Sequence, residues 1–195
     1  MPAWTTADPV GLHARAQPDR LACVDLASGR RWTYAALDDA IQRAVAVLEN
    51  GFGIERGQRI ATLARNSADL VILQQAAMRL GAIFVPVNWR LAGPELQAIL
   101  ADCGPVLLVH DIALDMAPPS GCASLEVSRF QAAVEEPLPA LRRPLPGADR
   151  PSIILYTSGT SGQPKGVIVT EANAFATAVN FGVIGRVGHD SVFLC

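Results

Sequence analysis

One fourteen-residue stretch, Y-T-S-G-T-S-G-Q-P-K-G-V-I-V at residues 156–169, constrains the fold of this chain more than any other part of it. It follows the apolar run Ile153–Tyr156, which predicts a buried strand, and it ends in the β-branched run Val167–Val169, which predicts a second strand. Small and hydroxylated residues lie between the two runs. The sequence therefore predicts a loop whose two ends are held by strands.

The composition of this loop suits phosphate groups. Glycine allows positive φ and places no Cβ between backbone N–H groups and a ligand, and consecutive N–H groups form a concave site for anionic oxygens. Lys165 is the single lysine among sixteen basic residues, and its compact ammonium is not reproduced by a planar guanidinium. We therefore predict that the loop binds a polyphosphate through a set of hydroxyl, glycine and ammonium groups: Thr157, Ser158, Gly159, Thr160, Ser161, Gly162 and Lys165.

Three other well-known loops do not fit the spacing. Counted from Gly159, the pattern G-x-x-x-x-G-K-[ST] would need a glycine at Pro164 and a hydroxyl residue at Gly166. The pattern G-x-G-x-x-G of dinucleotide-binding folds is not met either. The nucleophile elbow G-x-S-x-G fails because Gln163 replaces its last glycine, so an α/β hydrolase is discarded.

The loop resembles the signature Y-T-S-G-T-T-G-x-P-K-G-V of the adenylate-forming superfamily, and it differs from that signature only at Ser161, which keeps the hydroxyl. Residues 80–91 are similar to the segment G-A-x-x-V-P-x-N-x-R-L of acyl-CoA synthetases. Peptide-synthetase adenylation domains tend to carry aspartate where this chain has Asn88, so the resemblance favours the acyl-CoA synthetase, or AMP-dependent ligase, branch. Thr33-Tyr34 is similar to the T-Y-x-E-L opening of these enzymes, although this pair is also ordinary for the start of a helix.

Composition and charge narrow the class further. Half of the residues are hydrophobic (50%) and 17% are charged, which favours a mostly buried α/β fold over a disordered chain. A net charge of −2 argues against nucleic acid as the main partner. Neither a secretion leader nor a membrane span is predicted, because no basic and apolar leader opens the chain and polar residues interrupt its most apolar region. The cysteines lack C-x-x-C spacing, so we expect reduced thiols in a cytoplasmic protein at Cys23, Cys103, Cys122 and Cys195.

Capping and turn residues predict alternating helices and strands, hence an α/β fold with a largely parallel sheet flanked by helices. We expect helices at 9–18, 33–51, 67–80, 95–102 and 171–183 and strands at 21–26, 31–33, 59–63, 83–87, 105–109, 153–156, 167–169 and 191–195. A short strand and helix are also expected within 125–134. Five prolines between residues 137 and 151 predict an extended connector, which lies within a single domain of residues 1–195.

The resemblance implies a fold and a chemistry. The fold would be the N-terminal subdomain of an adenylate-forming enzyme. The substrates would be ATP with Mg²⁺, a small-molecule carboxylic acid, and CoA as co-substrate. Thr157 would lie near the magnesium. No residue of the chain is a convincing general base, general acid or nucleophile, and the three histidines, at 13, 110 and 189, are expected to be surface or core residues. In relatives a T-H-x-N run follows the loop strand; here Glu171 takes the histidine position, so that histidine's contacts cannot be transferred.

Two functions stay open at this point. In the first, the chain is the N-terminal portion of an AMP-forming acyl-CoA synthetase, contributes the phosphate-binding loop and is inactive alone. This expectation follows from segments that the relatives carry further along and that are not found here: the adenine-binding Y-G-x-T-E, the ribose-binding T-G-D and the C-terminal lysine. In the second, it is a non-catalytic truncated homologue that acts as a nucleotide-binding or protein-interaction module. Both leave room for homo-oligomers.

Overall fold

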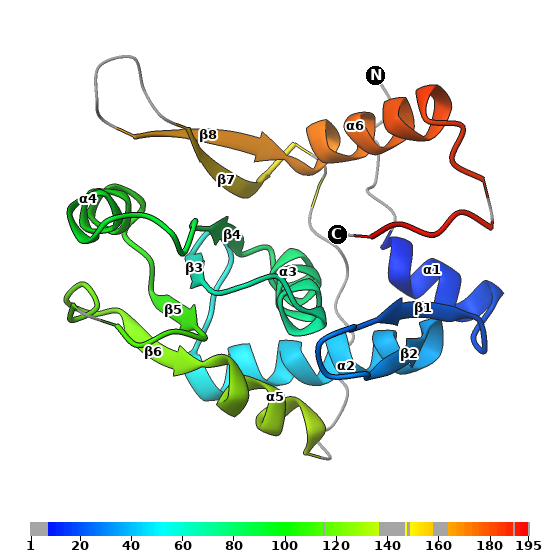
Figure 1. The fold of residues 1–195 in the computed structure, drawn as a ribbon, viewed down its shortest axis with the longest axis horizontal. Helices are drawn as coiled ribbons and strands as arrows, with labels where there is room; N and C mark the ends of the chain where they lie inside the picture. The colour runs from blue at the N-terminus through cyan, green and yellow to red at the C-terminus, as the bar shows by residue number, and fades with distance from the viewer. Residues whose placement is uncertain are drawn as a thin grey trace.

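The computed structural model describes residues 8–114, 116–136, 147, 149–157, 164–188 and 190–194. Its helices are α1 (Pro9–Ala16), α2 (Tyr34–Ala46), the π-helix η1 (Val47–Gly51), α3 (Ala68–Leu80), α4 (Gly93–Cys103), α5 (Val127–Glu135) and α6 (Glu171–Ile184). Its strands are β1 (Leu21–Val24), β2 (Arg31–Thr33), β3 (Arg59–Leu63), β4 (Ile83–Pro86), β5 (Leu107–His110), β6 (Ala123–Glu126), β7 (Pro151–Thr157) and β8 (Lys165–Thr170). Helices and strands alternate along most of the chain, so the predicted α/β class is confirmed (Figure 1).

Six strands form one sheet in the order β6-β5-β3-β4-β7-β8. Four neighbouring pairs are parallel, and only β7 and β8 run antiparallel. The first two strands, which match the strands predicted at 21–26 and 31–33, form a separate antiparallel hairpin. The prediction of a largely parallel sheet flanked by helices is therefore confirmed.

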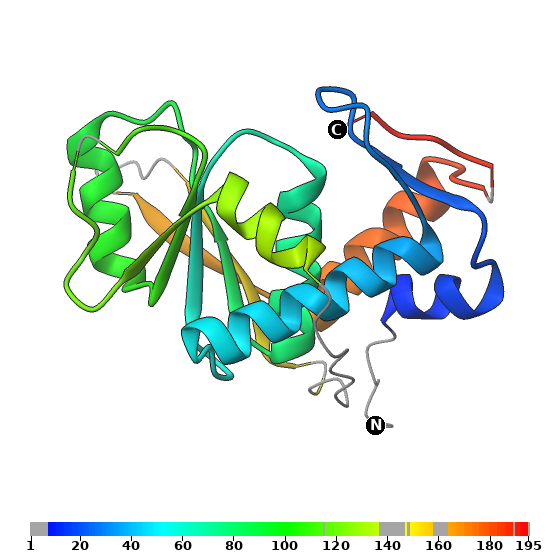
Figure 2. The same cartoon turned by 90° about the horizontal axis from the view of Figure 1, so that it is seen from below.

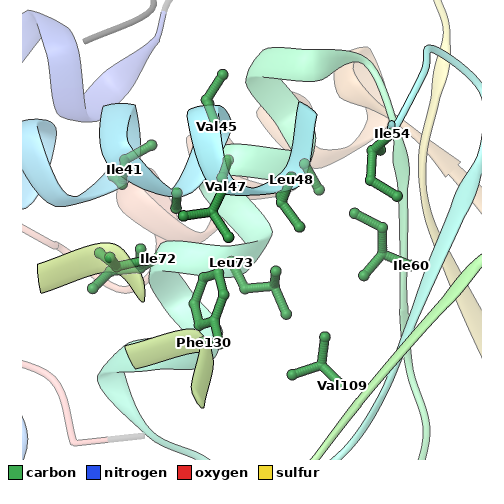
Figure 3. Packing of buried hydrophobic residues seen from close by; sticks show 14 of the residues in the cluster. Ile41, Val45, Val47, Leu48, Ile54, Ile60, Ile72, Leu73, Val109 and Phe130 are labelled. Atoms are coloured by element: carbon green, nitrogen blue, oxygen red, sulfur yellow. The ribbon is translucent and has the colours of Figure 1, made fainter. Parts of the chain in front are cut away.

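Helices cover both faces of the inner strands. Successive residues of a strand point to opposite faces, and in β3 Ile60 joins the core under α2, α3 and α5, whereas Ala61 joins the core under α4. Figure 2 shows these helices on the two sides of the sheet. Figure 3 shows the larger core, in which Leu73 and Phe130 lie close to each other and near Val109 of the sheet. Because both faces are covered, every residue of β5 is buried.

The helix ends follow the capping residues read from the sequence. The side chains of Asp8, Thr33 and Ser67 accept hydrogen bonds from backbone N–H groups in the first turns of α1, α2 and α3. Gly81 ends α3 in the left-handed conformation, with φ of 76°, which glycine adopts without strain. The helix predicted at 33–51 is α2 continued by η1, so it ends at Gly51 as predicted, but its last turn is the π-helix η1.

The N-terminal elements pack against α2 (Figure 1), and a buried ion cluster joins three helices there. Arg79 of α3 lies 2.5 Å from a carboxylate oxygen of Asp38 in α2 and 2.8 Å from one of Asp8 at the start of α1. Gln42 donates to the other oxygen of Asp38 at 2.6 Å. The guanidinium therefore has carboxylate partners from two helices, which is what a buried charge requires.

The structure differs from the prediction at one strand and describes only part of the predicted connector. The strand predicted at 191–195 is wrong for residues 191–194, which the structure describes and which form no strand. No strand among the described residues pairs with them, Ser191 instead closes a turn with Gly188, and Val192 is 94% exposed. Of the proline-rich connector, residues 137–146 and 148 lie outside the described residues, and Pro151 already belongs to β7. Among the described helices, none combines the length and the apolar character that crossing a membrane would need.

Candidate functional site

The predicted loop is carried by the hairpin of β7 and β8. The two strands pair in antiparallel register, so that Tyr156 faces Gly166 and Thr157 faces Lys165. The chain thus leaves the sheet at Thr157 and returns to it at a directly opposite residue. Five of the predicted site residues lie outside the described residues: Ser158, Gly159, Thr160, Ser161 and Gly162. The structure brings together the remaining two, Thr157 and Lys165.

The hairpin leaves the sheet at its carboxyl edge. β7 runs parallel to β4 through the pair Phe84–Ile153, so Thr157 lies at the same edge as the end of β4. In open α/β sheets, ligands bind outside the carboxyl ends of the strands. The segment after β4 contains Arg90, which is exposed and stacks on Trp89, with 4.4 Å between its guanidinium carbon and the ring centroid. This arginine is solvated.

Lys165 is exposed, and no ion pair joins it to another residue that the structure describes. The side chain of Thr157 is exposed as well. The ammonium of Lys165 and the hydroxyl of Thr157 can both donate hydrogen bonds to phosphate oxygens. This arrangement can therefore hold an anion at the end of the hairpin. No cluster of three or more potential metal ligands occurs in the part of the chain that is described.

Asp102 is a residue of this region that the sequence analysis missed. It lies in the last turn of α4, and its Oδ2 accepts a hydrogen bond of 2.5 Å from the hydroxyl of Tyr156. Burial, together with this hydrogen bond, raises the pKa of Tyr156 well above its usual value. The two residues line a hollow of about 330 Å³ together with Arg59, Cys103, Ile154, Gly166 and Ile168. Nothing in the sequence pattern links positions 102 and 156.

Glu171, which replaces the histidine of the family pattern, opens α6 and is buried. Its Oε1 lies 3.0 Å from Nη2 of Arg150, which also donates to the backbone oxygen of Met78 at 2.6 Å. The two side chains are only 7% and 8% exposed. Burial raises the pKa of Glu171, although the positive charge of Arg150 opposes the shift, and burial lowers the pKa of Arg150. The pair therefore anchors the base of the hairpin to α3, away from Thr157.

Cys103 lines the hollow beside Tyr156, whereas the other described cysteines and histidines do not. His110 is buried at the end of β5, and its two ring nitrogens lie 2.9 Å from the Ile112 backbone oxygen and from Ser124 Oγ. The ring of His13 lies 4.8 Å from the ring of Tyr34. His189 and Cys195 lie outside the described residues. Cys103 is buried, Cys23 and Cys122 are partly buried, and burial raises the pKa of the Cys103 thiol to about 11.

Known proteins with similar sequences include two CoA ligases. The chain is 34% identical over 170 residues to an indoleacetate–CoA ligase of Aromatoleum aromaticum, which covers 77% of this chain and 32% of the relative. It is 34% identical over 181 residues to the long-chain-fatty-acid–CoA ligase FadD13 of Mycobacterium tuberculosis, which covers 85% of this chain and 35% of the relative. The chain therefore spans about a third of the length of these curated relatives.

A solved structure extends the likeness to the fold. The N-terminal subdomain of Klebsiella oxytoca NpsA, in complex with 3-hydroxybenzoyl-AMSN, superposes with a TM-score of 0.71 at 27% identity. The match covers 86% of this chain and 41% of that one. Residues 12–195 match the protein family described as AMP-binding enzyme. The chain belongs to the AMP-binding enzyme family, and it corresponds to the N-terminal part of its acyl- and aryl-acid-activating members.

Proposed function

We propose that this chain supplies the phosphate-binding loop of an AMP-forming acid–CoA ligase of the cytoplasm. The observation that carries the proposal is the facing pair Thr157–Lys165 at the carboxyl edge of the sheet, within a chain that matches the family from residue 12 to residue 195. The signature of the loop lies between these two residues. The proposed set of phosphate ligands is Thr157, Ser158, Gly159, Thr160, Ser161, Gly162 and Lys165.

In the proposed reaction, a carboxylate oxygen attacks the α-phosphorus of ATP and pyrophosphate leaves, which gives an acyl-adenylate. The thiolate of CoA then attacks the acyl carbon and AMP leaves, which gives the thioester. The loop contributes by position and charge, because phosphorus displacement needs the β- and γ-phosphates held in line and their developing negative charge offset. Lys165 supplies the charge, while hydroxyls and glycine N–H groups supply directed hydrogen bonds.

The other reactants follow from the same proposal. Mg²⁺ would enter with ATP and offset phosphate charge beside Thr157, whose exposed hydroxyl fits that place. The acid is a small-molecule carboxylic acid. The names of the two relatives point to an indole acid and to long-chain fatty acids, so they support the class of acid and select no single member of it.

Binding of magnesium tripolyphosphate to the chain tests the proposal, because this probe presents the phosphates without needing adenine or ribose contacts. Calorimetric titration should show binding by the wild type and an affinity about tenfold lower for Lys165→Ala, the loss expected for one charge-assisted contact. Lys165→Arg should recover part of the affinity, because charge returns without compactness. Thermal midpoints should not change, since Lys165 is exposed.

The glycines provide the matched comparison within the loop. A Cβ at Gly159 or Gly162 should obstruct the approach of backbone N–H groups to phosphate, whereas Ser158→Ala removes one hydroxyl that water can replace. Gly159→Val and Gly162→Val should therefore weaken binding more than Ser158→Ala. If all three variants and Lys165→Ala bind tripolyphosphate as the wild type does, the loop is no phosphate site and the proposed function is wrong.

A second candidate is a non-catalytic nucleotide-binding or protein-interaction module. It is favoured by the apolar side chains that β8 and α6 leave exposed, among them Ile168, Phe175 and Val183. Incubation with ATP, Mg²⁺, CoA and a panel of fatty and aromatic acids tests whether the chain alone is catalytically active. We expect the chain alone to release no AMP above background, and sustained turnover would contradict its inactivity in isolation.

A further inference from the structure

Gly166 leaves room for an aromatic ring. It faces Tyr156 across the hairpin, and a Cβ built on Gly166 would lie 3.2 Å from Tyr156 Cζ, 3.3 Å from its hydroxyl oxygen and 3.0 Å from Ile154 Cγ2. These separations are closer than ordinary van der Waals contacts. The ring of Tyr156 therefore lies directly against the backbone of Gly166, an arrangement in which an aromatic residue covers a glycine on the neighbouring strand.

The position of the ring brings its hydroxyl to a firmly held acceptor. Tyr156 donates to Asp102 Oδ2 at 2.5 Å, a hydrogen bond strengthened by the charge of the carboxylate. The end of α4 that carries Asp102 is tied to the sheet, because Arg59 of β3 donates to the backbone oxygens of Cys103 at 2.7 Å and Gly104 at 2.6 Å. Asp102 thus belongs to the rigid part of the fold.

This hydrogen bond lies beyond the last backbone pair that joins β7 to β4. The pairing of β7 with β4 consists of Phe84–Ile153, whereas β7 pairs with β8 as far as Thr157–Lys165. Beyond Ile153, the ladder therefore ties β7 to β8 and not to the inner strands. In Figure 1, the ends of β7 and β8 that lead into the loop lie on the side of α4. The hydrogen bond from Tyr156 to Asp102 connects this part of the hairpin to α4.

We propose that Tyr156 and Asp102 are positioning residues that hold the facing pair Thr157–Lys165 in place, with Gly166 providing the space for the ring. This inference rests on the proposed function, because it assigns the hydrogen bond to the phosphate site. The hydrogen bond acts through the ends of the loop, so its loss should affect ligand affinity more than global stability. It also explains why tyrosine and glycine occupy these two places around the loop.

The test uses the whole chain and magnesium tripolyphosphate. Tyr156→Phe and Asp102→Ala should each raise the Kd about fivefold, the effect of one lost hydrogen bond, as measured by calorimetry well below the thermal midpoint. Asp102→Asn keeps an acceptor oxygen and should stay within about twofold of the wild type. The matched control is Tyr34→Phe, the same change at the other tyrosine of the chain, and it should leave the Kd unchanged.

Two further readouts separate positioning from a general loss of structure. In the Lys165→Ala background, Tyr156→Phe should change the Kd less than about twofold, because the group that it positions is gone. Amide hydrogen exchange at Thr157 and Lys165 should be about tenfold faster in Tyr156→Phe, with the amides of β3 and β5 unaffected. If the wild type binds and Tyr156→Phe binds equally well, the positioning role is wrong and the proposed function stands. If the wild type does not bind the probe, the proposed function falls and the positioning role falls with it.

Discussion

The part of the chain up to α5 and the part from β7 to α6 bury their apolar residues to very different degrees. In the first part, four of the five residues of β3 and every residue of β5 are buried. In the second, four of the six residues of β8 are exposed, and Glu171 is the only buried residue of α6. Phe175 and Val179, two apolar residues of α6, are both exposed. Helix and strand formation can thus be read from apolar runs in both parts, but burial depends on which neighbours the fold supplies.

The largest expected difference concerns two phenylalanines. Phe130 of α5 is 1% exposed in the larger core, whereas Phe181 of α6 is 58% exposed and has a ring contact with Phe193. Phe130→Ala should lower the free energy of unfolding by about 3–5 kcal/mol, because it leaves a cavity. Phe181→Ala should cost about 1 kcal/mol or less, the scale of one exposed aromatic pair. Urea unfolding of both variants measures these two losses of stability. Equal losses would contradict the expected difference between the two parts.

A buried ion pair between Arg150 and Glu171 helps to attach the second part to α3. Arg150→Ala should lower the free energy of unfolding by about 3 kcal/mol, because an unpaired carboxylate stays buried beside α3. The control is Asp111→Ala, which breaks the exposed pair with Arg65 at 3.1 Å and should cost less than about 1 kcal/mol in the same urea titration. A loss as small for Arg150→Ala as for this control would mean that the hairpin does not depend on the buried pair.

Local sequence signals predict most of the helices and strands, but they do not predict the contacts between distant elements. Ser67 and Gly81 mark the two ends of α3 because capping depends on residues close in sequence. The predicted strand at 191–194 fails because a strand requires a partner, which an apolar run does not specify. The hydrogen bond of Tyr156 to Asp102 joins residues 54 positions apart, and the contact of Arg150 with Glu171 joins residues 21 apart. Such contacts follow from the strand order, which the capping pattern does not determine.

A smaller effect should appear in dye binding. Val183 and Ile184 at the end of α6 are 74% and 83% exposed, next to other apolar residues of the same helix. Replacing both with glutamine should lower the fluorescence of a bound hydrophobic dye about twofold, because the dye binds contiguous apolar surface. Leu26→Gln is the control, since Leu26 is 74% exposed near β1 and outside this surface, and it should leave the fluorescence unchanged. Equal fluorescence for all three proteins would indicate that α6 offers the dye no continuous surface.

The smallest effect concerns pH, where the two parts should respond in opposite directions. Asp25 accepts hydrogen bonds from the backbone N–H groups of Ser28, Ala27 and Ala68, which lower the pKa of its carboxyl below the ordinary 3.8. The unfolded chain therefore binds the proton more readily, and the stability that Asp25 contributes is lost as pH falls below 3.8. Burial raises the pKa of Glu171 above 4.5, so the folded chain binds the proton more readily and stability declines as pH rises through this range.

Urea unfolding from pH 3 to pH 8 would separate the two groups. Asp25→Asn should flatten the loss of stability at the acid end, and Glu171→Gln should remove a decline that begins above about pH 4.5, the ordinary value for a glutamate carboxyl. Each variant should leave the other limb of the profile unchanged, because the two groups lie in separate parts of the fold and share no partner. The contrary result is a stability that declines with pH above that value as steeply in Glu171→Gln as in the wild type. That result would mean that Arg150 compensates the cost of burying the carboxylate, and that the two parts do not respond to pH in opposite directions.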